Sequence, residues 1–275
     1  EYTRSLSRNG FAQVTAVFSD STDIYFARQQ VAERLRAAEE NLPEGAVSTM
    51  GPIATGLGEI YMWTVHFQHR KDDKHKPGEP GIQPDGSFIT PEGEWLVSEA
   101  DQATYLRTAQ DWIVAPLLKN TPGLAGVDSI GGYVKQFQVI PDVQQLAALG
   151  MTLTDLARAL QENNVGLGAG VINRGGEGLA VRSDARIRNI GELAGTVIAT
   201  REGIPLRLDK VAQGRLGQAI RFGSASENGK EVVVGTAIMR IGENSRTVAS
   251  EVAKRIQTVN ASLPTDVVIQ PVLDR

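Results

Sequence analysis

Apolar and polar positions follow the same pattern near the two ends of the chain. Each copy reads as an apolar strand, a turn, a polar helix cap, an amphipathic helix and a closing Leu-Pro pair, and the copies align without a gap. The caps are Asp23 and Asn244, and the closing prolines are Pro43 and Pro264. Asp and Asn side chains accept hydrogen bonds from the first amides of a helix, and proline cannot continue one. The copies lie near opposite ends of the chain, much further apart than the ~20–50 residues between solenoid repeats. The pattern therefore predicts two similar small domains.

The N-terminal copy begins with a predicted hairpin. Two alternating apolar stretches are separated by Asn9-Gly10, a strong signal for a tight turn between strands. Helix 23–41 follows, and its apolar positions recur with helical spacing. The residues expected to face inward are Ile24, Val31 and Leu35.

Two strand–helix–strand units, the second of which is the C-terminal copy described above, predict an α+β fold. One such unit followed by another is the split βαβ, or ferredoxin-like, pattern. Right-handed crossovers place both helices on the same face of a single sheet. The predicted strands are 60–67, 126–130, 231–239 and 266–273, and the predicted helices are 101–119 and 244–261.

Three other stretches complete the organisation. Residues 68–98 are polar and rich in Pro and Gly, which predicts an excursion without a regular period. Residues 134–226 alternate short strands and helices and form a mixed α/β insertion between the two units. Residues 1–57 supply only the second half of a ferredoxin-like domain, so we expect them to expose apolar surface or bury it against another chain. The predicted segments are 1–57, 58–133, 134–226 and 227–275.

Composition narrows the class of protein. The 275 residues carry a net charge of −4, which does not suggest a nucleic-acid partner. Cysteine is absent, which excludes disulfides and thiolate metal sites. The first residues of the given sequence do not predict a signal peptide, and no apolar run reaches the ~18 residues that a membrane helix needs. We therefore expect a soluble chain, compatible with its being part of a longer protein.

Enzyme chemistry is not indicated. The chain has no Gly-x-Ser-x-Gly motif and no other nucleophile–base pattern. Gly166-Leu-Gly-Ala-Gly170 lacks the Lys-Ser/Thr of a phosphate loop and follows a predicted helix, so it predicts a bulged strand or a turn. We expect no enzymatic activity and no cofactor.

Many separate motifs, in order along nearly the whole chain, resemble the heavy-metal efflux branch of the resistance-nodulation-division pumps, in particular its cation-exporting, CzcA-type members. They are Phe11-Ala-Gln-Val-Thr, Gly51-Pro-Ile-Ala-Thr-Gly-Leu-Gly-Glu-Ile60, Gln110-Asp-Trp-Ile, Thr121-Pro-Gly-Leu, Ile130-Gly-Gly-Tyr133, Met151-Thr-Leu-Thr-Asp-Leu, Glu227-Asn-Gly-Lys-Glu231 and Ile241-Gly-Glu-Asn-Ser-Arg246. The resemblance implies the first large periplasmic loop of such a pump. Residues 1–57 would be a partial first porter subdomain, 58–133 and 227–275 the second porter subdomain, and 134–226 an inserted docking subdomain.

The resemblance also implies what the whole protein does. The family's pumps are trimeric proton/cation antiporters of the bacterial inner membrane, which export metal through a periplasmic adaptor and an outer-membrane channel. Their proton coupling resides in membrane helices, so we expect none of it in this chain. The docking insertion would contact the channel and contribute a protruding hairpin to subunit contacts. The alternative, from another class, is a free-standing periplasmic binding or adaptor module. Apolar stretches of about 20 residues encoded on both sides would support the pump.

Candidate metal ligands are few. The resemblance places one wall of a cation cleft at Glu59 and Asp128, and carboxylate oxygens suit hydrated divalent ions. The two strands that carry them are expected to be separated by a third, so their backbones would lie roughly 10 Å apart. We expect the acids to act with ligands from elsewhere or as successive stations on a path. The alternative is a surface Glu at a strand start and an Asp in a turn.

Histidine and methionine give weaker signals. His66 is a further candidate ligand, although related pumps often carry an acid at its position. His66, His69 and His75 flank a run that contains Lys and Arg, whose positive charges would repel a cation. A solvated loop is therefore the favoured interpretation. The four methionines are widely separated, which favours Zn, Co, Cd or Ni over Cu or Ag. The methionines are Met50, Met62, Met151 and Met239.

Overall fold

The computed structural model describes residues 2–8, 10–43, 45–54, 58–69, 76–175 and 177–275. The chain divides into two units, Glu1–Ile53 and Ala54–Arg275. Both combine helices with antiparallel strands, and the strands form several separate sheets. The predicted mixed α and β composition is therefore confirmed, and each unit is described by itself.

The first unit consists of a hairpin and one helix. Strands β1 (Tyr2–Arg8) and β2 (Phe11–Val17) pair in antiparallel register, and Gly10 has the positive φ of +73° that a tight turn requires. Helix α1 (Ile24–Glu39) is capped by Asp23, whose carboxylate accepts a hydrogen bond from the Phe26 amide at 2.9 Å. The predicted hairpin and helix cap are confirmed, while Asn9 lies outside the described residues.

This unit buries little apolar surface within itself. Ala27 is its one buried hydrophobic residue among those that the structure describes. The three helix residues expected to face inward are half-buried, which fits that expectation. The large hydrophobic residues that remain exposed are Tyr2, Leu6, Phe11, Val14, Phe18, Tyr25, Phe26, Leu42, Val47 and Met50. The unit thus exposes an extended apolar surface, as expected for a partial domain.

A five-stranded antiparallel sheet organises the second unit. Strand β15 lies at its centre, paired with β3 on one side and with β7 on the other; β16 adds to β3, and β14 pairs with the start of β15. The bounds are β3 (Glu59–Phe67), β7 (Leu124–Ile130), β14 (Ala225–Glu227), β15 (Lys230–Met239) and β16 (Val267–Asp274). The four predicted strands therefore form one sheet, and β15 separates β3 from β7 as expected.

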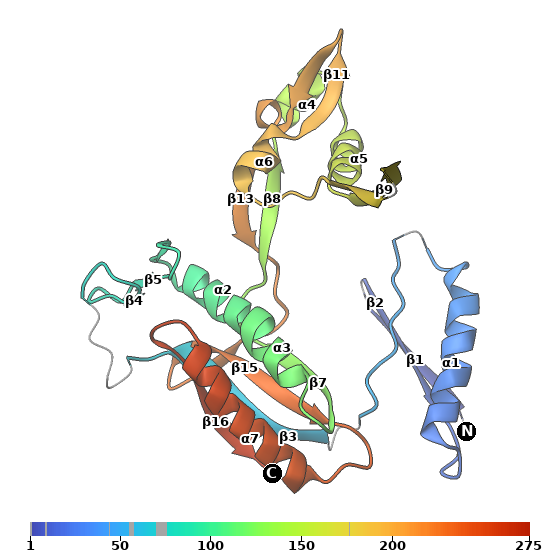
Figure 1. Ribbon diagram of the computed structural model, residues 1–275, viewed down its shortest axis with the longest axis vertical. Coiled ribbons are helices and arrows are strands. Elements are labelled where there is room, and N and C mark those ends of the chain that lie inside the picture. The colour runs from blue at the N-terminus through green and yellow to red at the C-terminus, as the bar shows by residue number, and fades with distance from the viewer. Residues whose placement is uncertain (1, 9, 44, 55–57, 70–75, 176) are drawn as a thin grey trace. The chain divides into compact units, whose positions relative to one another are not determined.

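Two helical stretches cover one face of this sheet (Figure 1). The first combines α2 (Glu99–Ala109), a π-helical turn (Gln110–Val114) and α3 (Ala115–Lys119), and the second is α7 (Ser245–Ser262). The predicted cap of α7 is confirmed, since the Asn244 side chain accepts from the Thr247 amide. The helix widens just before Pro116, which has no N–H to bond the preceding turn.

The main core lies between these helices and the sheet. Its largest fully buried side chain is Trp63 of β3, which lies over Gly235 of β15. A Cβ atom at Gly235 would come within 2.2 Å of the Trp63 ring. The indole can therefore lie across the centre of the sheet because position 235 carries no side chain.

Residues 81–96 contain a small sheet that the sequence did not predict. Strands β4 (Gly81–Ile82), β5 (Phe88–Ile89) and β6 (Trp95–Leu96) are joined by turns in which Gly86 and Gly93 have positive φ. Strands of two residues are too short to show a period, so an excursion without a regular period can still contain them. Phe88 and Leu96 join the main core. Residues 70–75 lie outside the described residues.

The elements between Lys135 and Gln218 have a core of their own, consisting of Leu146, Leu156, Leu193, Ile198, Leu208 and Val211. An antiparallel ribbon of β8 and β13 carries them, and the side chains of Asp142 and Thr152 cap α4 and α5. The glycine-rich stretch is a bulged strand, as predicted, because Val181 pairs with Gly170 and Arg182 with Gly168. The bounds are β8 (Lys135–Pro141), α4 (Val143–Ala148), α5 (Leu153–Asn163), β9 (Gly166–Arg174), β10 (Glu177–Asp184), α6 (Ile190–Gly195), β11 (Val197–Arg201), β12 (Ile204–Arg207), a 3₁₀ turn (Leu208–Lys210) and β13 (Ala212–Gln218).

Replacing Gly235 by alanine should destabilise the second unit. The new methyl group would overlap the Trp63 ring, and overpacking of this kind costs about 1–3 kcal/mol. Denaturant unfolding of the chain measures the change in the free energy of unfolding. The matched control is Gly126→Ala in β7, where a Cβ meets no atom within 4 Å. Equal stability of the two variants would contradict this account of the core.

Candidate functional site

The five-stranded sheet has a second face, opposite α2, α3 and α7, which we call the open face. Side chains alternate between the two faces of a strand. Val233 and Ala237 of β15 belong to the main core beneath the helices. Thr236 and Ile238, which alternate with them, therefore lie on the open face.

Glu59 reaches the open face because of a β-bulge. Tyr61 pairs with Ala237 on the helix side, and the next residue of β15, Ile238, pairs with Glu59 rather than with Ile60. Strict alternation from Tyr61 would place Glu59 beneath the helices. The extra residue, Ile60, is buried, and Glu59 is exposed. Bulges often re-aim a side chain in this way beside functional sites.

Asp128 lies on the same face from the other side of β15. It pairs with Thr236, while its neighbour Val127 pairs with Ala237 and packs against the main core. Its side chain is exposed. The structure thus places both predicted acids on the open face, in adjacent rows of side chains on that face.

The two acids are too far apart to bind one ion by themselves. Their partners on β15 are Ile238 and Thr236, two residues apart, and β15 itself lies between them. With strands ~4.8 Å apart and ~3.4 Å per residue, their Cα atoms are separated by roughly 12 Å. Within the described residues, no three His, Cys, Asp or Glu side chains are grouped so that they could hold a metal ion.

His66 lies on the open face but is not brought to the acids. It is seven residues from Glu59 along β3, or roughly 20 Å. Its Nδ1 is 3.3 Å from Thr64 Oγ1, which donates to Glu227 Oε2 at 3.0 Å, and its Nε2 is 3.4 Å from Gln68 Oε1. The sequence did not predict the contact of Glu227 with Thr64, because it depends on the pairing of β14 with β15.

His69 belongs to a different contact. Its Nδ1 lies 3.1 Å from Oδ2 of Asp266, a fully buried carboxylate that also accepts from the Ile82 amide. The His69 side chain is itself 63% exposed, which fits the expectation of a solvated loop only in part, since it has a fixed partner. His75 lies outside the described residues.

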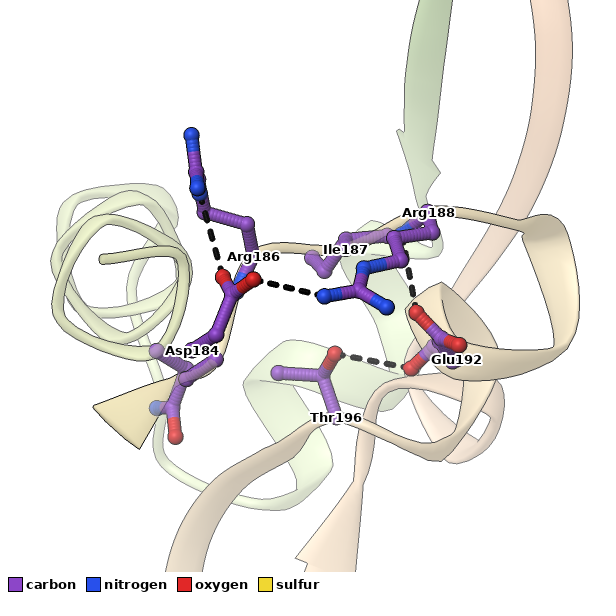
Figure 2. Close-up of a pocket in the computed structure, with 8 residues that line it drawn as sticks. Asp184, Arg186, Ile187, Arg188, Glu192 and Thr196 are labelled. Atoms are coloured by element: carbon purple, nitrogen blue, oxygen red, sulfur yellow. Dashed lines mark hydrogen bonds and ion pairs between the residues drawn. The ribbon is translucent and has the colours of Figure 1, made fainter. Parts of the chain in front are cut away.

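A cavity of about 360 Å³ in the inserted elements is lined by groups that engage one another (Figure 2). Asp184 accepts from Arg186 Nε at 3.1 Å and from Arg188 Nη2 at 2.6 Å, and these bonds lower the pKa of its carboxyl to about 2. Glu192 accepts from the Arg188 amide at 2.8 Å, and Thr196 Oγ1 donates to the Glu192 carbonyl. These bonds tie the end of β10 to α6, which indicates a structural role.

A second cavity, of about 300 Å³, lies where α2 and β6 meet the β8–β13 ribbon. Two polar contacts cross it, from Lys135 Nζ to Glu94 Oε2 at 3.6 Å and from Gln218 Nε2 to Asp101 Oδ1 at 2.9 Å. Burial, with added repulsion from nearby glutamates, raises the pKa of Tyr105 to about 12. The contacts link the inserted elements to the main sheet region.

The whole chain, residues 1–275, matches the model of the AcrB/AcrD/AcrF family. The chain belongs to this family. It is 50% identical to the nickel and cobalt resistance protein CnrA of Cupriavidus metallidurans over 277 residues, covering 100% of the chain and 26% of that protein. It is 44% identical to the cobalt-zinc-cadmium resistance protein CzcA of the same organism, covering 100% of the chain and 24% of that protein.

Solved structures agree with this assignment. A crystal structure of a heavy metal efflux pump superposes with a TM-score of 0.74 at 26% identity, over 99% of this chain and 24% of that one. The predicted membership of the heavy-metal efflux branch is therefore confirmed. The chain spans about a quarter of the length of the relatives it matches. None of the helices described in the structure combines the length and apolar character needed to cross a membrane.

The chain by itself should bind zinc only weakly. Two acids ~12 Å apart cannot chelate one ion, so isothermal titration should show dissociation constants of about 1 mM or higher. The Glu59→Gln, Asp128→Asn variant should titrate almost identically. Micromolar binding that this variant abolishes would contradict the geometry described above.

Proposed function

We propose that this chain is the periplasmic porter and docking part of a proton-driven pump that exports heavy-metal cations across the bacterial inner membrane. Residues 58–133 and 227–275 form the second porter subdomain, residues 1–57 part of the first, and residues 134–226 the docking subdomain. The observation that carries the proposal is the match of the entire chain to one pump family. The strand order β7-β15-β3-β16, with both helical stretches on one face, supports a ferredoxin-like porter subdomain.

The exported cation is a borderline divalent ion such as nickel, cobalt, zinc or cadmium, rather than copper or silver. Relatives at 44–50% identity are named for resistance to nickel, cobalt, zinc and cadmium. Soft ions favour grouped Met or Cys ligands. The chain has no Cys, and Met62 and Met239 lie on opposite faces of the sheet. The cation is cargo, and the chain carries no cofactor and no enzymatic activity in this proposal.

Glu59 and Asp128 form one wall of the cation path in this proposal. Both are exposed on the open face, and their separation suits two successive stations or two partial sites completed by ligands from outside this chain. Carboxylate oxygens bind hydrated divalent cations, and a site with few ligands releases them readily. His66 takes no part with them in this arrangement, because it lies at the other end of β3.

The intact pump acts as a homotrimer with a periplasmic adaptor and an outer-membrane channel, and binds no nucleic acid. The β9–β10 hairpin supports a subunit contact, because Leu179 and Ile172 pair across it and are both more than half exposed. The exposed apolar surface of the first unit likewise favours burial against another segment or chain. Proton coupling is assigned to segments other than this chain.

Metal resistance of cells tests the proposal. The complete gene, expressed in a strain that lacks its own metal pumps, should raise the inhibitory concentrations of nickel, cobalt, zinc or cadmium and leave those of copper and silver unchanged. Protection against copper and silver alone would refute the assigned metal class. No protection against any metal, with the protein present in the membrane, would refute the pump.

The gene itself distinguishes the proposed pump from the alternative, a free-standing binding module. Apolar stretches of about 20 residues encoded on both sides of this sequence support a membrane pump. Stop codons immediately beyond Arg275 would favour the module instead.

Removing both acids should weaken export. In the intact pump, Glu59→Gln with Asp128→Asn should reduce transport at limiting metal by at least about tenfold, because even one lost charged contact costs about 1.5–3 kcal/mol. The matched control is Glu162→Gln with Asp209→Asn, which removes the same charge from exposed positions in the inserted elements. Membrane levels measured by immunoblot should be equal. Full resistance in the first variant would remove both acids from the mechanism.

A further inference from the structure

A buried amide bridges the two strands that carry the acids. Gln110 is fully buried, and its Oε1 accepts from Trp63 Nε1 of β3 at 2.9 Å. Its Nε2 donates to Ser129 Oγ of β7 at 3.2 Å. One side chain from the helix layer therefore contacts two strands that do not pair with each other.

The bridge passes over Gly235 of the intervening strand β15, a position without a side chain. Trp63, Gly235 and Ser129 form one row across β3, β15 and β7. Glycine in a strand interior supplies no side chain for packing and weakens the strand. The Trp63 ring occupies the space above Gly235, and the Gln110 amide accepts from that ring, so together they supply cross-strand contacts that position 235 lacks.

The row of Trp63, Gly235 and Ser129 lies close to the irregular end of the sheet. Both ladders of β15 shift register around Ile238, where β3 skips Ile60 and β7 skips Ala125. Asp128 directly precedes Ser129 in the chain, and Glu59 lies just beyond the bulge in β3. On the helix side, one row, that of Ala237 with Tyr61 and Val127, lies between the bridged row and the bulges.

Gln110 reaches this row from a π-helical turn. The turn Gln110–Val114 contains the wider i→i+5 spacing, which is rare and frequently marks functional sites. The residue stands at the start of that turn with its side chain directed into the core. A polar side chain here costs stability unless both of its hydrogen-bonding groups are satisfied, which they are.

We propose that Gln110 is a positioning residue for cation transport, which sets the spacing and register of β3 against β7 and thereby the separation of Glu59 and Asp128. The inference rests on the proposed function of those two acids. Gln110 lies on the helix side of the sheet and acts through the strands, without touching the cation. Its loss should loosen the acids relative to each other and weaken cation capture more than maximal transport.

The test uses the intact pump in proteoliposomes under a fixed proton gradient, with nickel as the transported ion. Gln110→Met keeps an unbranched side chain but removes both hydrogen bonds. The nickel concentration for half-maximal transport should rise about tenfold, and the maximal rate should change less than twofold. A tenfold rise is the lower end of the effect seen when a group that orients a metal ligand is removed. The control Thr104→Val removes a buried hydroxyl that bonds only the backbone of α2, and it should leave both values unchanged.

A mutant cycle separates positioning from general stability. In the Glu59→Gln, Asp128→Asn background, Gln110→Met should cause no further rise in the half-maximal concentration. An equal rise in both backgrounds, or no rise with the acids intact, would overturn the inference. Should Gln110→Met fail to accumulate, Ser129→Ala removes one of the two bonds and should shift the same value in the same direction, and an unchanged value would overturn the inference.

The Glu59→Gln, Asp128→Asn variant measured alone distinguishes failure of the proposed role of the acids from failure of the role of Gln110. If it transports normally, the proposed role of the acids fails and the positioning role fails with it. If it is impaired while Gln110→Met is normal, the acids remain and only the role of Gln110 is overturned.

Discussion

The buried indole N–H of Trp63 requires an acceptor, and the arrangement of the main sheet depends on how that requirement is met. A buried donor without a partner costs about 1–3 kcal/mol. Gln110 supplies the acceptor, and Gly235 supplies the room for the ring. The helix layer, the central strand and both of its neighbours are therefore fixed relative to one another by four residues that are far apart in the sequence: Trp63, Gln110, Gly235 and Ser129. A substitution at any one of them affects the others.

The second unit contains two hydrophobic cores that share no residue. The core of the main sheet surrounds Trp63, and the core of the inserted elements surrounds Leu208. Between them run the β8–β13 ribbon and two polar contacts, Lys135 with Glu94 and Gln218 with Asp101. Exposed ion pairs contribute little stability each, so the inserted elements owe theirs to their own core. This separation is what the proposed docking subdomain requires, because an insertion into the proposed porter subdomain needs a core of its own.

In the proposed function, the open face carries a path for cations and not a tight binding site. Its two acids are exposed, are separated by a strand and are not joined by a third ligand among the described residues. A tight site would slow release, whereas a pump must release its cargo at every cycle. The full-chain family match and the resistance proteins at 44–50% identity support the proposed pump, within which the two acids are proposed as one wall of the cation path.

The sequence by itself determined what local chemistry controls. Helix caps such as Asp23 and Asn244, the Gly10 turn and the two strand–helix–strand units follow from nearest-neighbour hydrogen bonding and from apolar periodicity. Only the tertiary structure decided that Glu59 shares a face with Asp128, because the bulge at Ile60 arises from pairing with β15. It also decided that residues 81–96 form a sheet and that Gln110 bridges β3 and β7. Register and burial of this kind depend on contacts between distant segments, which no local pattern encodes.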